Sequence, residues 1–217
     1  MTETPAKRGR PRSFDADKTL ARVRDAFWDA GFSATSLDDL ATATGLNRPS
    51  LYGAFGDKRD LYGRVLEDYR AQARSGMANA LRAERPLREG LGLVFELAMA
   101  LYLPKAKPAR GCFMIGTAVT EAVLDEGVRQ SLAEGLREIE RAFEKRLRLA
   151  KERGEIGKDR DPAALAMMSA ASLYLISIKA RVGEPRRVLE GIAKSAVHLI
   201  CGTPPKKRAK LRGSSRR

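Results

Sequence analysis

The sequence contains few of the residues that most enzyme centres and metal sites need. Its 217 residues include two cysteines, Cys112 and Cys201, and one histidine, His198. Two distant cysteines exclude a disulfide-built secreted scaffold and a cysteine-rich zinc site. A hydrolase relay would have to use His198, which lies in an apolar helical stretch, so we expect a partly buried packing residue. The sequence therefore predicts no enzyme, no metal site and no cofactor.

Long hydrophobic runs are also missing. The longest uncharged stretch, residues 162–178, has seventeen residues and contains three serines. That is short for a membrane span and more typical of a buried core or interface helix. Residues 1–6 lack the apolar segment of a signal peptide. We expect a cytoplasmic protein with no membrane partner.

Positive charge is in excess, but it is unevenly placed. The chain has 41 Lys and Arg against 27 Asp and Glu, a net charge of +14, and the last fourteen residues hold seven basic and no acidic side chains. Half of the excess therefore lies in residues 204–217, which we expect to be a disordered basic tail. Such a tail attracts any polyanion weakly, so the total charge alone does not identify a nucleic-acid-binding body.

The composition favours an all-α protein of about nine helices. Strand-like alternation is scarce, and Ala, Leu, Arg, Glu and Met, all good helix formers, dominate. Residues 1–12, with two prolines and several basic side chains, are expected to be a flexible basic arm. Capping residues, glycines and prolines place the expected helices from near Asp15 to Gly31, then at 37–44, 48–54, 57–83, 87–103, 113–124, 128–153, 162–181 and 185–200.

Residues 37–56 have the spacing of a helix-turn-helix. Ala41 supplies a small side chain where two helices cross, and Gly45, four residues later, tolerates the positive φ of the turn. Leu40, Leu51 and Phe55 can bury one apolar face against a preceding helix. This pattern is typical of a DNA-binding motif. A bare three-helix packing unit shares several of these features.

The residues around the motif resemble the N-terminal domain of the tetracycline-repressor (TetR/AcrR) family. The resemblance covers residues 13–62 and rests on the segments Phe27–Phe32, Thr35–Leu37 and Ser50–Leu61. It implies a homodimeric transcriptional regulator, usually a repressor, whose C-terminal domain binds a small molecule and thereby releases DNA. It also implies a helix-turn-helix DNA-binding domain at 13–62 and a helical ligand-binding and dimerisation domain at 63–203.

Several side chains near the motif are candidates for DNA contact. Arg48 stands at the end of the second motif helix that approaches base edges, where it can read guanine or contact a phosphate. The resemblance gives Tyr52 and Lys58 phosphate-clamping roles. Asp38 could accept a hydrogen bond from cytosine or face solvent. The full set of predicted DNA contacts is Arg8, Arg10, Thr35, Ser36, Asn47, Arg48, Pro49, Ser50, Tyr52 and Lys58.

The arm adds a separate DNA signal. Lys7–Arg12 reads Lys-Arg-Gly-Arg-Pro-Arg, which resembles the core of an AT-hook. Arginines that flank Gly and Pro in this way lie extended in a narrow minor groove. Diffuse attraction to phosphates is the alternative for Arg8 and Arg10.

The second half of the chain is less informative. Gly111–Ala122 resembles a segment in a branch of the family that includes repressors sensing electrophiles and oxidants. A basic loop and a helix start favour thiolate at Cys112, whereas the apolar residues after it favour burial. Dimerisation is expected through helices 162–181 and 185–200. The candidate ligand contacts are Phe95, Met99, Tyr102, Cys112, Phe113, Met114, Thr117, Glu121, Met167, Met168 and Tyr174.

These observations predict a ligand-responsive, dimeric, DNA-binding transcriptional regulator that a small molecule releases from a palindromic operator. Its expected partners are double-stranded operator DNA, a second copy of itself and an unknown small-molecule effector. A structural nucleic-acid-binding protein without ligand control is the alternative. The uncharged helix and the large second domain favour the regulator, because DNA packaging needs no ligand site.

Overall fold

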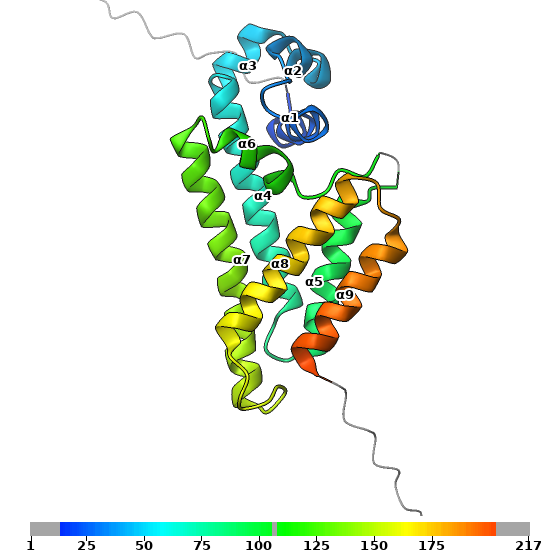
Figure 1. Ribbon diagram of the computed structural model, residues 1–217. Coiled ribbons are helices and arrows are strands. Elements are labelled where there is room, and N and C mark those ends of the chain that lie inside the picture. The colour runs from blue at the N-terminus through cyan, green and yellow to red at the C-terminus, as the bar shows by residue number, and fades with distance from the viewer. Residues whose placement is uncertain (1–13, 106–107, 203–217) are drawn as a thin grey trace, which may run out of the picture.

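The computed structural model describes residues 14–105 and 108–202. Within these ranges it contains nine α-helices and one π-helical segment and no strand, as the sequence predicts. A small module of three helices lies at one end, and four long helices form a bundle at the other (Figure 1). The helix α4 (Lys58–Ala80) belongs to both parts and runs without interruption through the expected domain boundary at residue 62.

The small module is built from α1 (Ala16–Ala30), α2 (Leu37–Thr44) and α3 (Arg48–Phe55). Side-chain caps begin all three helices, because each first turn has backbone N–H groups without helical acceptors. Asp15 caps α1, Ser36 caps α2, and Asn47 caps α3. Gly45 has a φ of 73° and makes the turn between α2 and α3. The module's core consists of the buried side chains Val23, Phe27, Trp28, Leu40, Leu51 and Phe55.

The bundle contains α5 (Leu87–Tyr102), α7 (Glu126–Glu152), α8 (Pro162–Arg181) and α9 (Arg186–Cys201). The helix α8 packs against α5, α7 and α9. It is long and apolar enough to cross a membrane by length and composition, and 44% of its most apolar window is buried in the fold. Outside the segment 113–124, the expected helix ends lie within three residues of the observed ones, as is usual where end turns fray, and those of α2 and α8 coincide.

The expected helix at 113–124 is present as far as Glu121, but it is not a regular α-helix throughout. The structure has a π-helical turn at Met114–Ala118, followed by the short α6 (Val119–Glu121). The reason is tertiary: the segment is held on both sides by other elements. The Cys112 N–H donates to Ser177 Oγ (2.8 Å), and the Thr117 hydroxyl pairs with that of Tyr62 (2.8 Å). A wider turn lets the segment satisfy both anchors, and such turns often occur at functional sites.

Candidate functional site

The exposed end of α3 carries most of the predicted DNA contacts. Asn47, Arg48, Pro49, Ser50 and Tyr52 are all exposed in one short segment. The Asn47 carboxamide oxygen accepts from the Ser50 N–H (2.9 Å), so this residue fixes the start of the helix. Tyr52 is 45% exposed, which leaves its hydroxyl accessible to a backbone phosphate.

Arg48 is held by Asp38, which lies in the first turn of α2. The Arg48 Nε donates to Asp38 Oδ1 at 2.6 Å, and Nη2 pairs with Oδ2. This carboxylate raises the pKa of the Arg48 guanidinium. Asp38 is exposed to solvent, as expected, with 69% of its side chain accessible, and it also pairs with Arg48, a contact that the sequence did not indicate.

Thr35 and Ser36 have different roles from each other. Thr35 is 2% exposed, and its hydroxyl donates to the Gly31 carbonyl oxygen at 2.6 Å. The structure therefore gives this hydroxyl a role at the end of α1 and does not present it to solvent, where a phosphate would bind. Ser36 is exposed and forms a capping box with Asp39, and these hydrogen bonds lower the pKa of Asp39.

Lys58 begins α4 beside the motif. Its ammonium lies 4.3 Å from the centre of the Phe32 ring, a cation–π arrangement that fixes the side chain. Partial burial lowers the pKa of Lys58, while the nearby Glu121 and Asp39 act in the opposite direction. The predicted contacts Arg8 and Arg10 lie outside the described residues.

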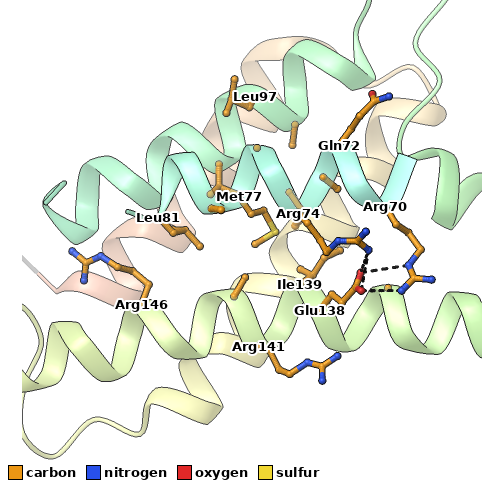
Figure 2. Close-up of a pocket in the computed structure, with 18 of the residues that line it drawn as sticks. Arg70, Gln72, Arg74, Met77, Leu81, Leu97, Glu138, Ile139, Arg141 and Arg146 are labelled. Atoms are coloured by element: carbon orange, nitrogen blue, oxygen red, sulfur yellow. Dashed lines mark hydrogen bonds and ion pairs between the residues drawn. The ribbon is translucent and has the colours of Figure 1, made fainter. Parts of the chain in front are cut away.

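A cavity of about 610 Å³ lies between α4, α5 and α7. One side is polar: Arg70 and Arg74 of α4 both bind the carboxylate of Glu138 on α7, with nitrogen–oxygen distances near 3 Å (Figure 2). The rest of the wall is largely apolar and includes Met77, Leu81, Val94, Leu97, Ala98, Leu101, Ile139, Ala142 and Leu149.

Three of the predicted ligand contacts line this cavity: Tyr102, Cys112 and Met114. Others are buried elsewhere in the core and do not line it, namely Phe95, Met99, Phe113 and Thr117. Tyr174 is half-buried outside the lining, and Glu121 turns towards the small module. The expectation that Met167 and Met168 face inward is wrong: they are 63% and 58% exposed, because the other side of α8 faces the bundle.

The sequence reading missed the contribution of α4 and α7 to the cavity. Ala73 and Gly76 on α4 and Gly135 and Ala142 on α7 all line it. Small side chains on two facing helices leave volume that larger residues would fill. The small residues at these positions could have indicated a cavity in the sequence, but only the packing of α4 against α7 shows that they face each other.

Cys112 forms part of the cavity wall and is buried, with 5% exposure. Burial raises the pKa of its thiol, although the Tyr69 hydroxyl, which donates to Sγ at 3.1 Å, acts in the opposite direction. Of the two opposing effects that the sequence left open, burial prevails over the basic loop. Arg110 instead pairs with Asp25 (2.8 Å) and lies over the Trp28 ring.

The segment from Gly111 to Asp125 joins the cavity to the small module. Cys112 and Met114 line the cavity, whereas the Gly111 carbonyl accepts from Trp28 Nε1 at 3.1 Å. Farther along, the Ser33 hydroxyl donates to Glu121 at 2.7 Å. A displacement of this segment would therefore reach α1 directly.

The outer side of α8 is apolar and uncovered. Met167, Met168, Leu175 and Ile178 are between 43% and 63% exposed. Their spacing puts them on one stripe of the helix. On the adjacent α9, Leu199 is 66% exposed, and His198 is exposed as well, so the expected packing role of His198 is wrong.

Comparisons with known proteins agree with this geometry. The family described as "Bacterial regulatory proteins, tetR family" matches residues 20–65, and "Tetracyclin repressor-like, C-terminal domain" matches residues 92–195. The HTH-type transcriptional repressor ComR of Escherichia coli (strain K12) is 33% identical over 193 residues, which cover 88% of this chain and 91% of ComR. The HTH-type transcriptional repressor BdcR of the same organism is 36% identical over 107 residues, 49% of this chain and 54% of BdcR.

Solved structures give the same picture. A cysteine mutant of the TetR family transcriptional regulator CifR, complexed with 26-base-pair double-strand operator DNA, superposes with a TM-score of 0.79 at 32% identity. The match covers 87% of this chain and 98% of the CifR chain. The reduced form of NemR from E. coli shares the fold, with a TM-score of 0.75 at 18% identity over 87% of this chain and 97% of NemR.

Proposed function

This chain belongs to the tetracycline-repressor family of transcriptional regulators, which are DNA-binding proteins and not enzymes, and we propose that it is a homodimeric repressor controlled by a small apolar effector. The observation that carries the proposal is the exposed N-terminal end of α3. It presents the guanidinium of Arg48, which is paired with Asp38, together with the hydroxyl of Ser50 and the phenol of Tyr52. We expect it to act in the cytoplasm, where operator DNA lies.

The proposed DNA contacts divide by their chemistry. Arg48 reads guanine, because a guanidinium can bond O6 and N7 of this base together. Tyr52, Lys58 and Ser36 contact phosphates and set the register without reading sequence. The exposed residues Asn47, Pro49 and Ser50 flank Arg48 and are proposed to lie beside the major groove with it.

Selection from a randomised duplex library tests this interface. Two recognition helices related by a two-fold axis engage half-sites about 34–36 Å apart, or a multiple of that distance, so the selected duplexes should contain an inverted repeat. Arg48→Ala should lose the preference at one base of each half-site, whereas Tyr52→Phe should weaken binding to all duplexes alike. Selected duplexes without an inverted repeat would contradict the dimeric operator.

The proposed dimer interface is the apolar outer side of α8 together with α9. An exposed stripe of this size on a soluble domain is typical of an interaction site. Sedimentation of Ile178→Glu should give a monomer at concentrations where the wild type is a dimer. Val123→Glu is a matched control, because Val123 is 77% exposed on the loop after α6 and away from this stripe. Equal dimerisation of the two variants would refute the interface.

The proposed effector site is the cavity between α4, α5 and α7. Its volume of about 610 Å³ lies in the range of small-molecule sites, which are mostly apolar with a few polar groups. The aromatic probe anilinonaphthalene sulfonate should bind the wild type and lower its operator affinity. Ala142→Trp should abolish probe binding and keep operator binding. Ala71→Trp, an exposed position of α4 outside the lining, should behave as wild type. Probe binding that survives in Ala142→Trp would place the site elsewhere.

A further inference from the structure

The contact between Asp38 and Arg48 has a specific geometry. Asp38 is the second residue of α2 and Arg48 the first residue of α3, so the pair joins the starts of the two motif helices. The carboxylate binds Nε at 2.6 Å and Nη2 through its second oxygen. Both side chains are more than half exposed, so the pair lies at the surface that faces DNA in the proposed complex.

This pairing uses one edge of the guanidinium and leaves another edge available. A guanidinium carries five N–H donors in one plane. Asp38 occupies the edge formed by Nε and Nη2, while Nη1 donates no hydrogen bond within the described residues. The terminal edge, formed by Nη1 and the second hydrogen of Nη2, can therefore still donate two parallel hydrogen bonds. That edge matches O6 and N7 of guanine in the major groove.

We propose that Asp38 is a positioning residue for sequence recognition, which holds Arg48 so that its terminal edge meets a guanine. This inference rests on the proposed base-reading role of Arg48. A free arginine side chain loses much rotamer freedom when it binds a base. Asp38 orders the side chain before DNA arrives, so the free-energy difference between guanine and another base is larger.

The carboxylate also has an opposite effect on general affinity. Its negative charge lies close to the phosphates in the proposed complex and weakens binding to any duplex, with a strong dependence on salt. Removal of Asp38 should thus tighten binding to unrelated DNA and weaken discrimination at the guanine. A purely structural role would change both affinities in the same direction.

The test compares wild type, Asp38→Ala, Arg48→Ala and the double variant. Each is titrated by fluorescence anisotropy with the consensus duplex selected by the wild type, with its single-base variants and with an unrelated duplex, at two salt concentrations. Discrimination at the position read by Arg48 should fall about two- to fivefold in Asp38→Ala, the ratio expected for an exposed ion pair. The double variant should equal Arg48→Ala, because Asp38 acts only through Arg48.

Asp39→Asn is the charge control, since it removes a neighbouring carboxylate that accepts hydrogen bonds from Ser36 and not from Arg48. It should keep full discrimination, and melting curves should confirm that every variant is folded. Unchanged or improved discrimination in Asp38→Ala overturns the inference, because Asp38 then makes no contribution to base recognition by Arg48 or opposes it. If Arg48→Ala itself keeps every base preference, the base-reading role of Arg48 and this inference fail together. If the wild type binds no duplex at all, the proposed function as a whole is refuted.

Discussion

The carboxylate of Glu155 connects three parts of the C-terminal bundle. It accepts two hydrogen bonds from Arg146 Nη2 of α7, at 2.8 and 3.0 Å. It also accepts from the Leu87 N–H at 2.5 Å, and thereby caps α5, whose N-cap residue Pro86 supplies no side-chain acceptor. Arg146 is only 3% exposed, and Glu155 compensates its buried charge.

Replacement of Glu155 by alanine should destabilise the protein by about 3 kcal/mol. Removal of one partner of a buried ion pair costs about 3–5 kcal/mol, because the other charge stays buried without compensation. Glu155 is 25% exposed, and water entering there should partly solvate Arg146, which places the cost at the lower end of that range. For a protein of this size, about 3 kcal/mol lowers Tm by about 6–12 °C.

Urea unfolding followed by circular dichroism measures the effect, at one fixed protein concentration because the stability of the proposed dimer would depend on it. Glu152→Ala is the matched control, since Glu152 is exposed in the last turn of α7 and forms no ion pair within the described residues. It should change the free energy of unfolding by less than about 0.5 kcal/mol.

Two results would refute this reasoning. Equal free energies of unfolding for Glu155→Ala and Glu152→Ala would show that the Arg146 charge needs no partner. Weakened operator binding by the folded Glu155→Ala protein would show that the change extends to the small module at the other end of α4.

Three further predictions concern the segment between the cavity and the small module and its contacts. Gly111→Ala should destabilise the protein by more than Gly154→Ala. Both glycines have positive φ, but a Cβ at Gly111 would lie 2.5 Å from the Ser177 carbonyl oxygen, whereas a Cβ at Gly154 would meet nothing within 4 Å. Equal melting temperatures of the two variants would contradict the close approach at Gly111. Burial raises the pKa of Tyr62 to about 12, so its contribution to stability is complete below the unfolded value of about 10 and is lost as pH rises towards 12. The difference between the ultraviolet titrations of wild type and Tyr62→Phe should show this delayed ionisation, and a difference signal centred near pH 10 in the folded protein would refute it. Because burial keeps the Cys112 thiol protonated, a mild electrophile should release wild type and Cys112→Ser from the operator equally, and release lost in Cys112→Ser alone would identify a reactive sensor.

The sequence was sufficient for the helices and the recognition motif, because both depend on local chemistry. Caps such as Asp15 and Ser36, the turn at Gly45 and the spacing of Leu40, Leu51 and Phe55 act within a few residues, so their pattern is readable along the chain. The same is true of the exposed end of α3 at Arg48 and Tyr52, because this short helix buries its other side.

The cavity and the inner roles of several side chains were decided by tertiary structure. Two facing helices with small residues create the empty volume, and neither helix reveals it alone. The orientation of α8 sends Met168 outward, and the anchors of the connecting segment produce a π-helical turn where local propensity predicts an α-helix.

Electrostatics shows the same division most clearly. Cys112 follows a basic loop and precedes apolar residues, so the sequence left open whether its pKa is lowered or raised. In the fold Arg110 pairs with Asp25, and burial beside Tyr69 raises the pKa of the thiol. The pairing of Asp38 with Arg48 joins residues from two helices. The sequence gives the sign of each charge. The packed structure determines which charged groups form pairs and how much water solvates them.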